Sequence, residues 1–120
     1  MKAAAIVASA LVLGGCAQQP IVAGQPRLGY VELAPYATHE DCADLVAGDR
    51  LDYRFESTEP ITFMIYYRDG GASIAPINRD KTLSEAGVFA ARIAARYCLS
   101  WEAHEGGSLV NYRANIRKPS

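Results

Sequence analysis

Three cysteines and two histidines are the residues of this sequence with the most distinctive chemistry: Cys16, Cys42, Cys98, His39 and His104. Thiolates and imidazoles bind zinc, usually from ligand pairs a few residues apart. His39 lies three residues before Cys42 and His104 six residues after Cys98, and the sequence has no Cys-x-x-Cys pair. This spacing is unlike that of a zinc motif. A metal site would need His39, Cys42, Cys98 and His104 to converge, so we predict no metal and no other cofactor.

Hydroxyl and carboxyl side chains form no recognisable catalytic motif either. A serine nucleophile needs a neighbouring base, and the sequence contains no Gly-x-Ser-x-Gly segment. The acidic pairs Glu40/Asp41 and Glu56/Glu59 stand beside expected turns, where charged pairs are usually solvated. Asp69-Gly70-Gly71 lacks the lysine and helix that follow a phosphate-binding loop. We therefore predict that the protein is not an enzyme.

The N-terminal segment resembles the leader of a bacterial lipoprotein. After Lys2, an apolar run over 3–13 would span only roughly 16 Å as a helix, too little to cross a bilayer. Leu13-Gly14-Gly15-Cys16 then resembles the lipobox, in which the cysteine is acylated and becomes the first residue. The resemblance implies a signal peptide over 1–15 and palmitate or a similar acyl chain on Cys16. The alternative is an ordinary secretory signal that leaves a free cysteine.

The residue after the cysteine bears on which membrane would hold the protein. Position 17 is Ala and not Asp, which by resemblance to Gram-negative lipoproteins implies the outer membrane. We expect the protein at the periplasmic face of the outer membrane, with the membrane as a partner through the lipid on Cys16.

With Cys16 lipidated, Cys42 and Cys98 remain in an oxidising compartment, where two such thiols usually pair. Their bridge would close a loop of 57 residues, counting both ends. The chain-entropy model gives such a loop about 4 kcal/mol of stabilisation. A redox or metal-binding pair is the alternative.

Composition indicates one globular domain that does not bind nucleic acid. The chain has 120 residues, half of them hydrophobic, and a formal net charge of −1. Nucleic-acid binding requires a basic face, so DNA and RNA are not expected partners. The lipidated Cys16 should begin a flexible tether over 16–27, which is rich in Gln, Pro and Gly. The folded domain should cover 28–120.

Hydrophobic residues alternate with polar ones in most of this domain, as they do in β-strands. The clearest expected strands lie at 51–55, 61–67, 97–101 and 110–116, and weaker ones at 29–33, 41–46 and 72–77. Gly106-Gly107 favours a hairpin between the last two clear strands. We predict an all-β fold, a small antiparallel β-sandwich of about seven or eight strands.

Residues 82–96 allow two interpretations. Thr82-Leu-Ser-Glu85 has the spacing of a helix capping box, and the alanines that follow favour a helix by propensity. In the other interpretation Gly87 is a turn, 88–93 is a strand and Ala94-Ala95 bends the chain into the next strand. The strand-rich surroundings favour this second interpretation.

Aromatic residues are abundant, and adjacent tyrosines in a strand point to opposite faces. Tyr67 shares a face with Ile61 and Phe63 and is expected in the core, as is Trp101. Met64 and Tyr66 lie on the other face, where they would form an apolar docking patch unless a loop covers them.

The segments GDRLDYRFES, PITFMIYY, GVFAARIAARYCLSWEA and SLVNYRANI together resemble a group of small bacterial envelope proteins of unassigned function. That group is similar to the Golgi-dynamics (GOLD) type of β-sandwich. The resemblance covers about residues 41–117 and implies a fold and an envelope location. Tyr66 and Ala103 stand where many of those sequences have His and Asn, so no shared polar site is implied there.

These observations predict a lipid-anchored extracytoplasmic β-sandwich module that is not an enzyme and binds a protein or another envelope component. The alternative is a periplasmic domain that handles a small ligand or a metal, with His39 or His104 in a closed pocket. A lysozyme-inhibitor lipoprotein is a third, narrower hypothesis, because such proteins are also small disulfide-bonded β-structures. No segment matches their inhibitory loop.

Overall fold

A computed structural model describes residues 18–119, and all six regular elements in this range are β-strands. The expected signal peptide and Cys16 lie outside the described residues. Within 18–119 no helix is long and apolar enough to span a membrane. The strands are β1 (Arg27–Leu33), β2 (Thr38–Leu45), β3 (Arg50–Asp69), β4 (Ala72–Ala90), β5 (Ala95–Ala103) and β6 (Ser108–Arg117).

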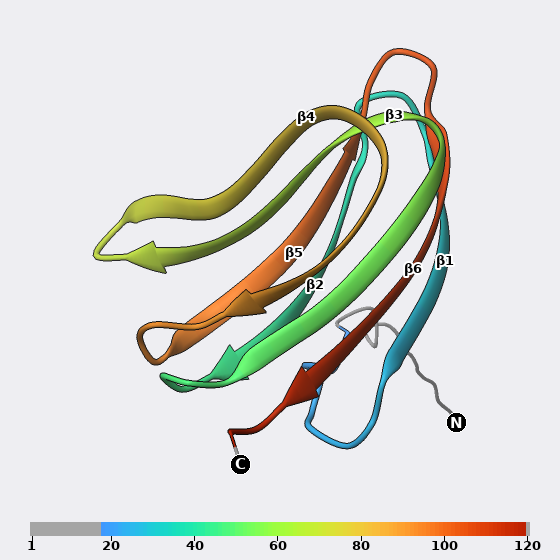
Figure 1. The fold of residues 1–120 in the computed structure, drawn as a ribbon. Coiled ribbons are helices and arrows are strands. Elements are labelled where there is room, and N and C mark those ends of the chain that lie inside the picture. The colour runs from blue at the N-terminus through green and yellow to red at the C-terminus, as the bar shows by residue number, and fades with distance from the viewer. Residues whose placement is uncertain (1–17, 120) are drawn as a thin grey trace, which may run out of the picture.

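All strand pairs are antiparallel and belong to one sheet in the order β1-β6-β3-β5-β2, with β4 paired to β3. The first half of β3, up to Ser57, pairs with β6, whereas its second half, from Ile61, pairs with β5. The chain bends between these halves, and β4 follows the bend alongside (Figure 1). The sheet is therefore curled into a half-barrel.

The predicted all-β class is confirmed, but the strand count and the two-sheet sandwich are corrected. The expected strands at 51–55 and 61–67 are one continuous strand, β3, and those at 72–77 and 88–93 lie largely in the single strand β4. Pro60 does not end β3 because it falls between the ladder to β6 and the ladder to β5, so its missing N–H removes no ladder hydrogen bond.

The strand interpretation of 82–96 is correct for 88–90, but Gly87 is not a turn, because it pairs with Tyr53 inside β4. The bend lies at 91–94, and Ala95 already belongs to β5. Thr82 does not cap a helix, because its hydroxyl donates to the carbonyl of Ser84, two residues on. The ladder to β3 gives 82–90 backbone hydrogen bonds along one edge and overrides the alanine-based helix propensity of this segment.

The concave side of the sheet holds the hydrophobic core, and its centre is aromatic. The rings of Phe55 and Phe63, from the two halves of β3, lie 4.6 Å apart, and those of Trp101 and Tyr112 lie 4.3 Å apart. Trp101 is fully buried, and Tyr67 packs against Tyr97 at 5.1 Å, both as predicted. Bending the sheet thus lets distant parts of one strand pack on each other.

Part of the segment expected to be a flexible tether packs on the domain. Ile21 is only 3% exposed, and its backbone N–H donates to the carbonyl of Cys42 at 2.8 Å. Arg27 already belongs to β1. The folded body therefore begins before residue 28, because an apolar side chain in this segment fits beside the edge of β2.

Candidate functional site

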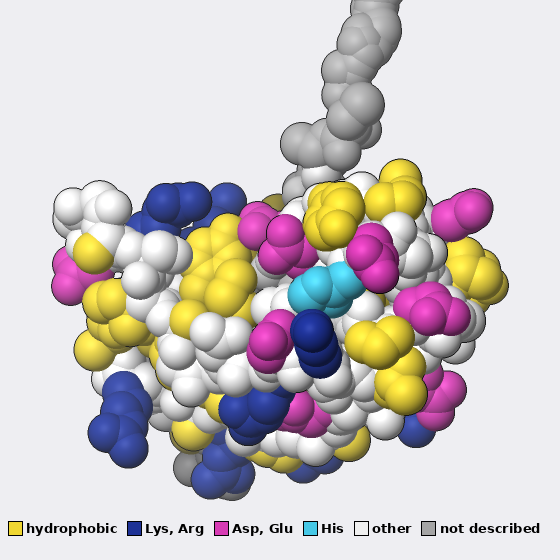
Figure 2. All heavy atoms as spheres, turned by 90° about the horizontal axis from the view of Figure 1, so that it is seen from above, with side chains coloured by type: hydrophobic (Ala, Val, Ile, Leu, Met, Phe, Trp, Pro, Cys, Tyr) yellow, Lys and Arg dark blue, Asp and Glu magenta, His cyan; other side chains and the backbone are white. Residues whose placement is uncertain are grey.

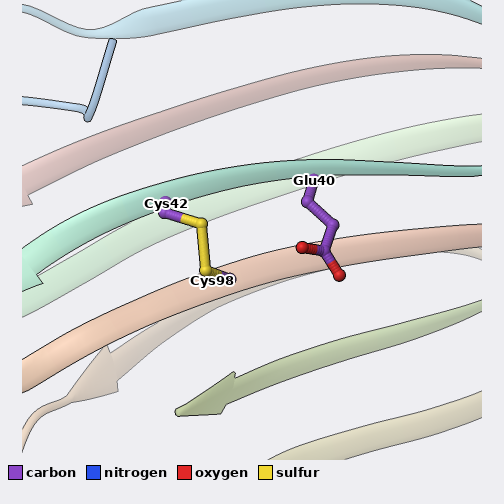
Figure 3. Close-up of side chains that lie close together, drawn as sticks. All are labelled: Glu40, Cys42 and Cys98. Atoms are coloured by element: carbon purple, nitrogen blue, oxygen red, sulfur yellow. A yellow bond between two sulfur atoms is a disulfide. The ribbon is translucent and has the colours of Figure 1, made fainter. Parts of the chain in front are cut away.

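Cys42 and Cys98 form the predicted disulfide (Figure 3). The two residues are directly opposite in the register of β2 and β5, with their α-carbons 4.0 Å apart. Glu40 lies close enough to complete a group of three potential metal donors. Because both sulfur atoms are used in the bond to each other, this group offers a metal only the carboxylate.

Met64 and Tyr66 lie on the convex face of the sheet, as their position in the strand predicted. Both side chains are partly buried. The Tyr66 hydroxyl donates to the Glu40 carboxylate at 2.8 and 2.9 Å, and the Arg68 guanidinium lies 5.8 Å from the Tyr66 ring centre. Burial, aided by the Glu40 carboxylate, raises the pKa of Tyr66. The expected patch is thus a small, partly polar surface beside the disulfide.

The two histidines do not meet each other or the cysteine sulfurs. His39 and Cys42 have opposite parity in β2, so His39 points to the inner face and Cys42 to the outer face. His104, in the loop after β5, lies with Nε2 2.9 Å from the Thr62 hydroxyl and 3.9 Å from the Asp80 carboxylate. Asp80 accepts a hydrogen bond from Thr62.

An ionic cluster around a buried carboxylate joins β1 and β2, which are two of the edge strands of the curled sheet. Asp41 of β2 is 1% exposed and accepts hydrogen bonds from Arg27 of β1 at 2.7 Å and from the Tyr112 hydroxyl at 2.8 Å. The Gln18 amide also donates to it at 3.3 Å. Paired in this way, the Asp41 carboxylate is compensated although it is out of water.

His39 completes this cluster through Tyr112. Its Nε2 lies 3.0 Å from the Tyr112 hydroxyl oxygen. That hydroxyl has one hydrogen, which it donates to Asp41, so the Nε2–H of His39 must be the donor. Burial lowers the pKa of His39, and burial raises the pKa of Tyr112 to about 12, with Asp41 acting in the same direction. Near neutral pH the lowered pKa favours the neutral form of His39, and the raised pKa keeps the Tyr112 hydroxyl protonated.

Two large, highly exposed apolar side chains lie next to each other on the outer face of β1, at one edge of the sheet. Leu28 is 73% and Tyr30 69% exposed, and they are neighbours on the outer face of this edge strand. A shallow hollow of about 350 Å³ adjoins them, lined by Leu28 and by residues of β6, β3 and β4. Figure 2 shows hydrophobic side chains exposed among charges of both signs also at the end of the molecule seen from above.

The sequence predicted a strand at 29–33 but neither the ionic cluster nor this surface. Alternation alone shows that Leu28 and Tyr30 share a face, without showing which face is inside. Gly29 is the residue of the sequence that could have indicated which face of β1 is inside, because the ring of Tyr112 occupies the space of a Gly29 side chain. A small residue between two large apolar ones in a strand is a sign that another group approaches closely on the opposite face.

No family model and no curated protein matches the chain. Among solved structures, the chain is similar to Aeromonas hydrophila PliG, a periplasmic inhibitor of g-type lysozyme, with a TM-score of 0.56 and 14% identity over 78% of this chain and 85% of PliG. It is similar also to the pre-peptidase C-terminal domain of a Bacillus anthracis collagenase, with a TM-score of 0.56 and 12% identity over 84% of this chain and 100% of that domain.

These likenesses define the class of the protein as a small all-β domain. At such low identity they show the fold alone. No family is assigned by them, so membership of the envelope group with a GOLD-like fold stays a prediction.

Proposed function

We propose that this protein is a lipid-anchored, non-enzymatic domain of the cell envelope that binds another protein. The observation that carries the proposal is the exposure of Leu28 and Tyr30 side by side on an edge strand. Tyrosine and apolar side chains on an outer face suit a macromolecular partner. On the concave side the buried Asp41 already accepts hydrogen bonds from the buried Tyr112 and from the partly buried Arg27.

An extracytoplasmic location supports the proposal. The Cys42–Cys98 disulfide is typical of oxidising compartments, and PliG, which shares the fold, is periplasmic. PliG is also an inhibitor of another protein, which favours a protein partner for this domain. The metal-handling alternative has lost its two thiolates to the disulfide.

Site-specific cross-linking in intact cells tests the partner. A photoreactive amino acid replaces Tyr30 in one variant, Tyr66 in a second and the exposed Val46 in a third, and mass spectrometry identifies the products. We expect one envelope protein to be captured from position 30. Capture from position 66 alone would assign the binding surface to the patch of Met64 and Tyr66. No captured protein, or equal capture from Val46, would contradict the proposal.

The lipid anchor is tested separately. In the Cys16→Ser variant the thiol that the lipobox-like segment offers for acylation is missing, so we expect the protein to leave the membrane fraction while its domain stays folded. Recovery of this variant in the membrane pellet would contradict anchoring through Cys16.

A further inference from the structure

The outer face of β6 and the first half of β3 carries a group of arginines in cross-strand register. Arg54 is directly opposite Arg113, and Arg50 is directly opposite Arg117. All four side chains are exposed. We call this set, Arg50, Arg54, Arg113 and Arg117, the arginine face. It adjoins Leu28, whose register partner in β6 is Arg113.

These arginines are incompletely neutralised. Arg117 pairs with Asp52 at 2.9 Å, but Arg50, Arg54 and Arg113 form no ion pair within residues 18–119. The other neighbours in the same rows are uncharged, namely Leu28, Ala86 and Ala90. The row between them pairs Asp52 with Asn115. Glu56 is the remaining acidic residue on the outer face of this half of β3. The face is positive although the whole chain has a net charge of −1.

Like charges directly opposite each other on neighbouring strands destabilise a sheet. Two arginine pairs in this arrangement therefore oppose folding, and they contribute nothing to the core. Arginine binds carboxylates through two parallel hydrogen bonds, and arginine and tyrosine are both enriched at protein interfaces. The surface has the charge and composition to bind a carboxylate-bearing partner beside Leu28 and Tyr30.

We propose that the arginine face binds an acidic segment of the protein partner. This inference rests on the proposed function, since it names the chemistry of the partner. The two arginine rows are separated by four residues of β3, which corresponds to roughly 13 Å. In an extended segment, carboxylates four residues apart would meet successive rows. The residue midway between two such carboxylates would face Asp52 and should be uncharged.

The probe for this proposal is a fluorescein-labelled Gly/Ser peptide with glutamate at every fourth position, and its control is the same peptide with glutamine. Fluorescence anisotropy measures binding to the wild-type chain and to two variants that lose equal charge. Arg54→Gln/Arg113→Gln alters the arginine face, whereas Arg68→Gln/Lys81→Gln alters exposed positions in the other halves of β3 and β4.

We expect the glutamate peptide to bind and the glutamine peptide not to bind. Kd should rise roughly fivefold to tenfold in Arg54→Gln/Arg113→Gln and stay unchanged in Arg68→Gln/Lys81→Gln. Higher ionic strength should weaken binding. Equal loss in both variants, or no binding of the glutamate peptide, would overturn the proposal.

Vesicles containing phosphatidylglycerol distinguish a membrane from a protein segment. If they bind with the same dependence on Arg54 and Arg113 while the glutamate peptide does not, the face contacts lipid and the proposal fails. A cross-linked protein at Tyr30 without peptide binding would overturn this inference alone. Absence of any cross-linked protein would instead overturn the proposed function.

Discussion

Tyr112 shows how one side chain can impose requirements on residues far away in the sequence. Its ring packs against Trp101 in a tilted arrangement, and its hydroxyl connects His39 with the buried Asp41. To reach Asp41 the ring crosses β1 at Gly29, where a β-carbon would lie 2.1 Å from a ring carbon. The hydrogen bond from Tyr112 to Asp41 therefore requires glycine at position 29.

Replacing Gly29 with alanine should lower the free energy of unfolding by about 2–3 kcal/mol, because the methyl group must displace the Tyr112 ring from its hydrogen bond to Asp41. Urea denaturation measures this loss. Gly106→Ala is the matched control, since its β-carbon would have nothing nearer than Glu59 at 3.9 Å. Equal midpoints for the two variants would show that the ring does not need this space.

The lowered pKa of His39 predicts how stability depends on pH. Its ordinary pKa is 6.5, and burial lowers it in the folded state. Below about pH 6.5 the unfolded chain therefore takes up this proton more readily than the folded chain, so stability should fall as pH falls from 7.5 to about 5.5. His39→Gln keeps a donor for Tyr112 but cannot titrate, and its stability should change less over this range. If the free energy of unfolding depends on pH equally in the wild type and in His39→Gln, the pH dependence does not arise from His39.

Among the elements, β3 is the strand on which the fold depends. It pairs with β6, β5 and β4, and its change of partner near Pro60 produces the curl of the sheet. By contrast β2 is an edge strand whose ladder runs to β5 alone. The disulfide joins β2 to β5 near the middle of this ladder, at the Cys42–Cys98 pair.

Removing the disulfide in Cys42→Ala/Cys98→Ala should lower the free energy of unfolding by about 2–4 kcal/mol, since the unfolded chain is no longer cross-linked. Hydrogen exchange should quicken most in β2, which loses its covalent link. Reduced wild-type protein serves as the control and should behave like the variant. A denaturation midpoint equal to that of the oxidised wild type would contradict this role.

At the scale of the whole molecule, the curl of the sheet brings two of its edge strands, β1 and β2, close to each other. The pair of Arg27 and Asp41 joins these two strands. The segment around Ile21 lies against the same edge of β2 through its bond to Cys42 and its bridge to Ala43. Residues before β1 therefore help to close the half-barrel.

Ile21→Ala should lower the free energy of unfolding by about 2 kcal/mol, because Ile21 is a buried core residue. Val22→Ala is the matched control: Val22 is half-exposed, and a change within about 0.5 kcal/mol is expected. Thermal or urea unfolding measures both variants. If the two are equally stable, the segment does not contribute to the folded body.

Several features of this protein followed from the sequence alone. The period-two alternation around Tyr53, Phe63, Trp101 and Tyr112 was sufficient for an all-β fold, because side chains in a strand alternate between faces. It also grouped Tyr67 with Phe63 on the face that proved to be inside. The pairing of Cys42 with Cys98 followed from cysteine count and compartment. Neither argument requires knowledge of which strands are neighbours in the sheet.

The tertiary structure alone decided how the strands are joined and what the surfaces contain. Whether Pro60 ends a strand depends on which partner is adjacent at that position, and Ala-rich 86–90 became a strand because β3 lies beside it. The clustering of Asp41, Arg27 and Tyr112 and the rows of arginines arise from register between strands distant in sequence. Register is set by the packing of the whole sheet, so no local pattern contains it.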